Sequence, residues 1–298
     1  MRNIMWAILA CFLWSTAFAG IKIGLRYMPP LGFAGIRFMI SGLLLLPFCG
    51  GLALFFRTVC SHFRTILLIA ALQTFFVYAL FYTGMTMVDG AIAAILIGSA
   101  PLISATLAHY LMHDDRFTPG KLISLLIGIG GIAIIALSRQ PWLAVGRSEF
   151  FGVLILLLSS VVGNTGNIFV ARERNSIPPL ILNSAQIFVG GLGLFLVSLV
   201  MEGVPDLHQP LEFYAALLWL AMLSAVAFSI WFTLLKKPGV RVSELNLWKF
   251  IIPVFGALLS WLVLPQESPE WSAIIGMVFV AGSILSFHLC LLERNCDK

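Results

Sequence analysis

The amino-acid sequence predicts an all-α integral membrane protein with ten transmembrane helices, arranged as two inverted five-helix repeats. Of its 298 residues, 60% are hydrophobic and only 10% are charged, whereas a soluble domain carries roughly 25% charged residues. The apolar residues gather in ten runs, each long enough to cross a bilayer core of ~30 Å as a helix. The second half of the chain also repeats features of the first. We therefore expect the lipid bilayer to surround the chain.

Short polar loops separate the ten apolar runs and leave no residues for a soluble domain. The first run follows Met1-Arg2-Asn3 and has the look of a signal peptide. We expect it to be retained as a helix, because its removal would leave an odd number of spans. The ten expected spans are 4–25, 30–53, 64–88, 90–112, 119–138, 150–171, 178–201, 212–235, 243–264 and 270–292.

The distribution of Lys and Arg over the loops predicts the orientation. Loops on the side of the two termini hold twelve of the eighteen Lys and Arg residues, and loops on the opposite side hold four. Cytoplasmic loops are the ones enriched in Lys and Arg. We therefore expect a multi-pass protein of the bacterial cytoplasmic (inner) membrane with both termini cytoplasmic. The net charge of +5 indicates topology and not a nucleic-acid-binding surface.

Several residues recur in the same order in the two halves of the chain. Arg37 corresponds to Gln186 and Gly42 corresponds to Gly191, in each case 149 positions later. Because each half holds five spans, an odd number, the second copy must lie upside down relative to the first. The expected divisions are a first repeat over 1–139, a second over 146–292 and a cytoplasmic tail over 293–298.

Two prolines, Pro101 and Pro253, lie near the middle of expected spans and are 152 positions apart. A proline inside a helix lacks the N–H donor and clashes with the preceding turn. Interrupted spans at corresponding places in two halves are typical of the central site of a transporter. We expect both prolines to act as hinges where the repeats move against each other.

The motifs of the two halves point to one family. They are Leu13-Trp14, Pro30, Arg37-Phe38, Pro101, Asp115 and Gly130 in the first half, and Pro179, Gln186, Pro253, Glu267, Gly276 and Gly282 in the second. This ordered pair of motif sets resembles the EamA-type, ten-helix members of the drug/metabolite transporter superfamily. The resemblance implies an exporter of amino acids, metabolites or drugs with a cavity between the repeats. The chain departs from the pattern at Gly163-Asn164, where an aromatic residue is expected, and at His113-Asp114-Asp115, which replaces Gly-Glu.

Polar side chains inside the expected spans are candidates for the solute-binding site, because they are costly in hydrocarbon. Ser15 lies on one face of the first helix, and Asn164 and Asn167 recur on one face of the sixth. We expect these residues to line the cavity. The alternative is that they form hydrogen bonds between helices, each worth ~0.6 kcal/mol.

Cations inside the expected spans are candidates for binding an anionic group of the solute. Lys249 lies one turn before Pro253, and Asn246 is three residues earlier on the same face. We expect Lys249 to neutralise a carboxylate. For Lys22 we favour extension toward the outer interface. For Arg37, packing against backbone carbonyls and a role as a ligand remain equally open.

Aromatic side chains lie within the spans and not only at the membrane interfaces. Tyr78 and Tyr82 share one helix face, and Trp14 and Trp231 lie in other spans. We expect these four residues to contribute to a pocket for an amphipathic or aromatic solute. Ordinary core packing is the alternative for each of them.

The sequence shows no pattern typical of an enzyme, a cofactor site or a metal centre. His109 and His113 have the spacing of metal ligands but lie at a helix end without further ligands. We therefore expect no enzymatic activity, no cofactor and no bound metal. The oligomeric state stays open, and a monomer is compatible with the sequence.

These observations predict a secondary transporter that exports a small organic solute, such as an amino acid or related metabolite, by alternating access. A membrane scaffold or sensor that reuses the fold without transport is the alternative from another class. Within transporters, drug and sugar-phosphate carriers are the alternatives.

Overall fold

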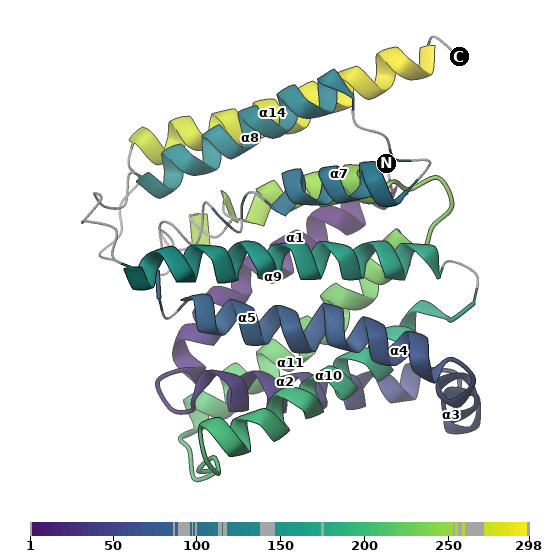
Figure 1. Cartoon of the computed structure of the whole chain (residues 1–298), viewed down its shortest axis with the longest axis vertical. Coiled ribbons are helices and arrows are strands. Elements are labelled where there is room, and N and C mark those ends of the chain that lie inside the picture. The colour runs from purple at the N-terminus through teal and green to yellow at the C-terminus, as the bar shows by residue number, and fades with distance from the viewer. Residues whose placement is uncertain are drawn as a thin grey trace. The chain divides into compact units, whose positions relative to one another are not determined.

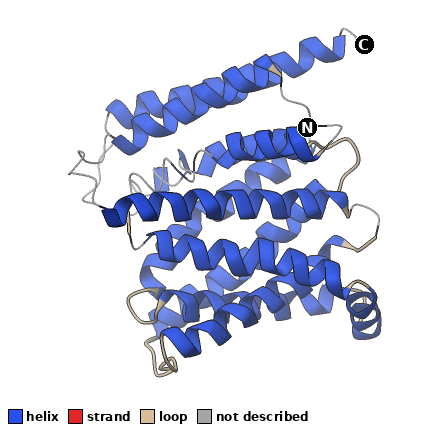
Figure 2. Ribbon diagram, in the orientation of Figure 1, coloured by secondary structure: helices blue, strands red, loops and turns tan. Residues whose placement is uncertain are grey.

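The computed structural model describes the chain at residues 2–85, 87–88, 96, 98, 100–112, 115, 118–137, 147–173, 176–252, 254–255, 258–259 and 271–296. Across these residues every regular element is a helix (Figure 2). Of the residues singled out by the sequence, His113, Asp114, Pro253 and Glu267 lie outside this part of the chain, as does the side chain of Lys22.

Figure 1 labels the helices of the described part of the chain. They are α1 (Arg2–Gly24), α2 (Pro30–Leu45), α3 (Leu52–Ser61), α4 (Phe63–Ala70), α5 (Phe76–Met85), α7 (Ala100–Leu111), α8 (Pro119–Leu137), α9 (Arg147–Arg172), α10 (Pro179–Met201), α11 (Leu211–Leu235), α12 (Val242–Leu247) and α14 (Trp271–Cys296). Three short turns are the 3₁₀ segments η1 (Leu46–Phe48) and η3 (Trp248–Phe250) and the π-helical segment η2 (Ala71–Phe75).

Five helices of the described part are long and apolar enough to cross a membrane. They are Pro30–Phe48, Phe63–Met85, Phe150–Arg172, Pro179–Met201 and Leu211–Leu235. Shorter apolar helices include Asn3–Ala17, Pro119–Ile134 and Ile274–Phe287. The all-helical, membrane-spanning fold class predicted by the sequence is thus confirmed.

One expected boundary is wrong. The sequence predicted a span over 30–53 followed by a loop, but the membrane-spanning helix ends at Phe48 and a separate helix, α3, covers Leu52–Ser61. Gly50 and Gly51 have φ angles of 77° and 106°, which residues with a Cβ rarely adopt. These two glycines end one helix and start the next in a new direction.

The structure divides into two compact units that do not coincide with the two sequence halves. Unit 1 comprises residues 1–83 and 165–240, and unit 2 comprises residues 84–164 and 241–298. Each unit therefore contains helices from both halves.

In unit 1, α2 packs along α10, and α1 packs along α11. Glycines allow the close approach of α2 to α10. A Cβ atom added to Gly42 would lie 2.8 Å from the carbonyl oxygen of Ser184, and one added to Gly191 would lie 3.0 Å from the carbonyl oxygen of Gly35. Ser184 follows Gly35 by the same 149 positions that separate Gly191 from Gly42. The contact is therefore reciprocal, as a contact across a two-fold axis must be.

The residue directly after α10 caps the N-terminus of α2. Pro30 occupies the first turn, where a missing N–H costs nothing, and the preceding residue supplies no side-chain cap. The carboxylate of Glu202, just after α10, accepts hydrogen bonds from the N–H groups of Leu31 at 3.0 Å and Gly32 at 2.8 Å. A carboxylate at a helix N-terminus satisfies free donors and the positive end of the helix dipole.

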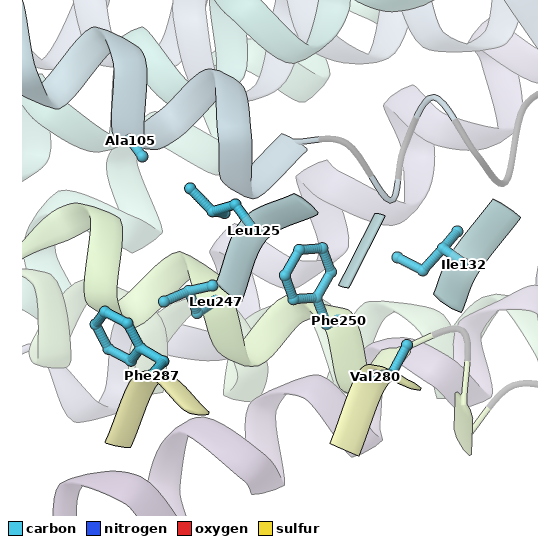
Figure 3. Packing of buried hydrophobic residues seen from close by; sticks show 7 residues of the cluster. All are labelled: Ala105, Leu125, Ile132, Leu247, Phe250, Val280 and Phe287. Carbon is cyan, nitrogen blue, oxygen red and sulfur yellow. The ribbon is translucent and has the colours of Figure 1, made fainter. Parts of the chain in front are cut away.

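In unit 2, α8 lies side by side with α14 (Figure 1). Small residues permit this contact as well, because a Cβ atom on Gly131 would lie 2.6 Å from the carbonyl oxygen of Gly276. The Ser283 hydroxyl donates to the carbonyl of Ser124. An apolar cluster fills the space among α7, α8, α12, η3 and α14 (Figure 3). Its buried members are Ala105, Leu125, Ile132, Leu247, Phe250, Val280 and Phe287.

A buried ion pair fixes the start of α12 in unit 2. The Nζ atom of Lys121 lies 2.6 Å from Oδ1 of Asp115, and both side chains are almost fully buried. The backbone N–H of Ser243 donates to Oδ2 of Asp115 at 2.8 Å. Because each charge has a partner, the pair avoids the penalty of an isolated buried ion. Asp115 therefore has a structural role in this unit.

We expect Gly191→Ala to lower the free energy of unfolding by about 1–3 kcal/mol, because overpacking a close helix contact forces a shift of backbone or side chains. The added Cβ would lie 2.8 Å from the Cβ of Phe38. Unfolding by SDS titration of the purified protein measures this. Gly282→Ala is the matched control, since among the described residues no atom outside its own stretch of helix lies within 4 Å of its added Cβ. Equal stability of the two variants would contradict the close α2–α10 contact.

Candidate functional site: polar and aromatic groups inside the helical units

The predicted site residues fall into both units. Trp14, Ser15, Tyr78, Tyr82, Asn167 and Trp231 belong to unit 1, whereas Asn164, Asn246 and Lys249 belong to unit 2. The division falls inside α9, between Asn164 and Thr165.

The two predicted tryptophans meet in unit 1. The ring centroids of Trp14 on α1 and Trp231 on α11 are 5.0 Å apart, and the ring centroid of Phe228, also on α11, lies 5.5 Å from that of Trp14. These edge-to-face arrangements are favourable for aromatic rings. Trp231 is buried and Trp14 is half-buried. Ser15, in contrast, donates its hydroxyl to the carbonyl of Phe12 in its own helix at 2.6 Å.

The two predicted tyrosines form a second aromatic group, around Arg37. Tyr78 and Tyr82 on α5 have ring centroids 6.3 Å apart. Phe38 of α2 lies 4.5 Å from Tyr78. The guanidinium carbon of Arg37 lies 4.3 Å from the centre of the Phe38 ring and 5.5 Å from that of Tyr78. These distances are typical of cation–π contacts. We call Arg37, Phe38, Tyr78 and Tyr82 the arginine–aromatic cluster.

Asn167 forms a hydrogen bond between helices of unit 1. Its Oδ1 atom accepts from Nε2 of Gln73 at 3.0 Å. Gly166 makes this approach possible, because a Cβ atom there would lie 2.7 Å from the same Nε2 atom. Gln73 belongs to the π-helical segment η2, and such segments occur frequently at functional sites.

A chain of buried polar side chains continues from η2, and the sequence analysis missed most of it. Oγ1 of Thr74 donates to Oε1 of Gln186 at 2.8 Å, and Nε2 of Gln186 donates to Oδ1 of Asn183 at 3.1 Å. Nδ2 of Asn183 then donates to Oγ of Ser229 at 2.9 Å. Polar residues at mid-span are the signal that points to such a chain. Which of these residues pair with each other depends on which helices are in contact, and a short stretch of sequence does not reveal that.

The predicted amides of unit 2 use their N–H groups within the protein. Nδ2 of Asn164 donates to the carbonyl of Ser160 at 2.8 Å and to that of Ala100 at 3.3 Å. Its Oδ1 atom is buried and has no hydrogen-bond partner among the described residues. Nδ2 of Asn246 donates to the carbonyl of Val242 at 2.9 Å. Lys249 lies in η3 and is half-buried.

The predicted hinge residue Pro101 is buried in the first turn of α7, and Leu96 and Gly98 before it are also helical. The Asn164 contact with Ala100 therefore reaches the residue directly before this proline. His113 and Asp114 lie outside the described residues, within which no three His, Cys, Asp or Glu side chains form a potential metal site.

We expect the Thr74–Gln186 hydrogen bond to show as a coupling in a double-mutant cycle. Gln186→Leu leaves buried polar partners unsatisfied and should cost about 1–3 kcal/mol of unfolding free energy. In a protein that already carries Thr74→Val the same change should cost less, with a coupling of about 0.5–3 kcal/mol. Unfolding of the two single variants and the double variant measures this. Additive effects would show that the two side chains do not interact.

Comparison with known proteins agrees with the fold. The model of the EamA-like transporter family matches residues 1–137 and 150–288. The chain is 23% identical to the uncharacterized transporter YoaV of Bacillus subtilis (strain 168), with 95% of this chain and 96% of the relative covered. It is 27% identical to a probable amino-acid metabolite efflux pump of Salmonella typhimurium, with 93% and 92% covered.

A solved crystal structure at 16% sequence identity superposes with a TM-score of 0.83 and covers 100% of this chain and 99% of its own. This likeness concerns the fold alone. The family match covers nearly all of both sequence halves. The chain is therefore a member of the EamA-like transporter family of the drug/metabolite transporter superfamily, a multi-pass membrane transporter.

Proposed function

We propose that this transporter exports a small organic solute, such as an amino acid or a related metabolite, across the bacterial cytoplasmic membrane. The solute is carried unchanged, by alternating access between two inverted repeats. Both termini lie in the cytoplasm, in agreement with the distribution of Lys and Arg over the loops.

The proposal rests chiefly on one observation, the efflux pump of Salmonella typhimurium that aligns with 93% of this chain. Its name refers to amino-acid metabolites, which are amphipathic and carry charged groups. Unit 1 of this chain contains groups suited to such solutes, namely the Trp14–Trp231 pair and the arginine–aromatic cluster. Aromatic walls with a small number of polar groups are typical of small-molecule sites.

The unit 2 residues Asn164, Asn246 and Lys249 are proposed to contact the solute as well. Asn164 supports this proposal, because its buried Oδ1 atom has no partner among the described residues. A buried acceptor without a donor is costly, and a donor group on the solute, such as an ammonium, would satisfy it. Pro101 and Pro253 are proposed as hinges of the movement.

We expect cells that produce this protein to release amino acids faster than control cells. Bacteria fed with dipeptides accumulate the component amino acids, and an exporter then lowers their internal concentration and raises the external one. The measurement is the time course of internal and external amino acids, with a C-terminal fluorescent fusion to match protein amounts. Cells that produce an unrelated multi-pass protein at the same level are the control. Faster accumulation inside the cells would show import and contradict the proposal.

A further inference from the structure

We propose that Arg37 binds the carboxylate group of the transported solute and that Tyr78 and Tyr82 contact the adjacent part of that solute. This inference rests on the proposed function, because it assigns a chemical group of the solute to one residue of unit 1. From the sequence alone, we expected Lys249 to bind the carboxylate of the solute. Lys249 is half-buried in the structure. Arg37 is the more deeply buried of the two cations, at 3% exposure.

The first argument is that the charge of Arg37 has no ion-pair partner among the described residues. Arginine stays protonated in proteins, and the Nε and Nη1 atoms of Arg37 are buried without a hydrogen-bond partner among the described residues. No Asp or Glu in the described part of the chain forms an ion pair with it. Burial of a charge without a partner is expensive. A side chain held in this state within a membrane is a candidate for ligand binding by default.

The second argument comes from the corresponding position in the second half of the chain. Gln186, 149 positions after Arg37, is also buried, but its side chain bonds to both Thr74 and Asn183. The position that corresponds to Asn183 in the first half is Ala34, which offers no polar side chain. The helix contact thus satisfies the glutamine and leaves the arginine unsatisfied. Hydrogen bonds within the protein therefore explain why a polar side chain is buried at Gln186, but they do not explain why one is buried at Arg37.

The third argument is the geometry of the arginine–aromatic cluster. Phe38 and Tyr78 lie 4.3 and 5.5 Å from the guanidinium carbon, and cation–π contacts of this kind contribute ~0.5–2 kcal/mol. The Nε and Nη1 donors of Arg37 stay without a hydrogen-bond partner among the described residues, and guanidinium N–H groups of this kind can bind a carboxylate in a bidentate manner. Within the described part of the chain, the buried hydroxyl of Tyr82 also has no hydrogen-bond partner. It is available to a further polar atom of the solute.

The ligand class follows from the charge. A single guanidinium matches a singly charged carboxylate better than a doubly charged phosphate. The aromatic rings of Tyr78 and Phe38 favour an apolar group next to the carboxylate, since they present ring faces rather than further charges. A solute such as an aromatic or large apolar amino acid meets both requirements.

The test compares matched pairs of probes on purified protein in detergent. L-phenylalanine is compared with L-phenylalaninamide, and benzoate with benzamide, at equal ionic strength set with chloride. Wild type, Arg37→Gln and Arg26→Gln are titrated, with the thermal unfolding temperature as the readout. Arg26 is the matched control, because it is exposed and lies near Glu212. We expect both carboxylates to stabilise wild type more than the amides do.

In Arg37→Gln the apparent Kd for the carboxylates should rise at least tenfold relative to wild type, while the apparent Kd for the amides should change less than twofold. In Arg26→Gln the apparent Kd of every probe should change less than twofold. Without any probe, Arg37→Gln should unfold at the same or a higher temperature than wild type, because an uncompensated buried charge is removed. Three results would each overturn the inference: no carboxylate effect on wild type, equal carboxylate binding by Arg37→Gln, or strong destabilisation of the unliganded variant. Carboxylate binding through Arg37 without efflux from cells would instead overturn the proposed function alone.

Discussion

The close contact of α2 with α10 is the constraint on which the rest of unit 1 depends. Gly42 and Gly191 bring the two backbones together, and the Ser184 hydroxyl then reaches the carbonyl of Gly42 at 2.7 Å. In a bilayer the hydrophobic effect does not drive helices together, so dispersion contacts and hydrogen bonds must do so. Glycines increase both by removing side-chain volume. Because the contact is reciprocal, it also relates the two halves of the chain to each other.

The same contact explains why the interior of unit 1 has both satisfied and unsatisfied polar groups. Once α2 and α10 are in place, Gln186 faces Thr74 and Asn183, whereas the position related to it by the repeat, Arg37, faces aromatic rings. Duplicated halves begin with equivalent surroundings and diverge residue by residue. A difference in polar partners at one pair of related positions is therefore informative about function. Proteins keep such costly groups mainly where they bind or transport something.

Much of this organisation could be predicted from the sequence. Length and hydropathy of the apolar runs specify membrane-spanning helices, and the aromatic residues chosen within spans do meet, as Trp14 and Trp231 show. The start of α3 was missed, because it depends on the backbone at Gly50 and Gly51 and not on hydropathy. The bonds of Asn183 and Ser229 were missed because they require knowing that α10 touches α11. The two roles left open for Arg37 could be weighed against each other only once its neighbours were known.

The account rests on the close α2–α10 contact within unit 1, and we infer that this contact stays intact during transport while the repeats move against each other elsewhere. Its most direct test is a disulfide between Gly32→Cys and Ser198→Cys in a protein without its native cysteines. The Cβ atoms at these positions lie 3.8 Å apart, which is the usual separation in a disulfide. Our account predicts that the disulfide forms and that solute efflux continues at the rate of the reduced protein. Loss of efflux on oxidation, restored by reduction, would contradict it.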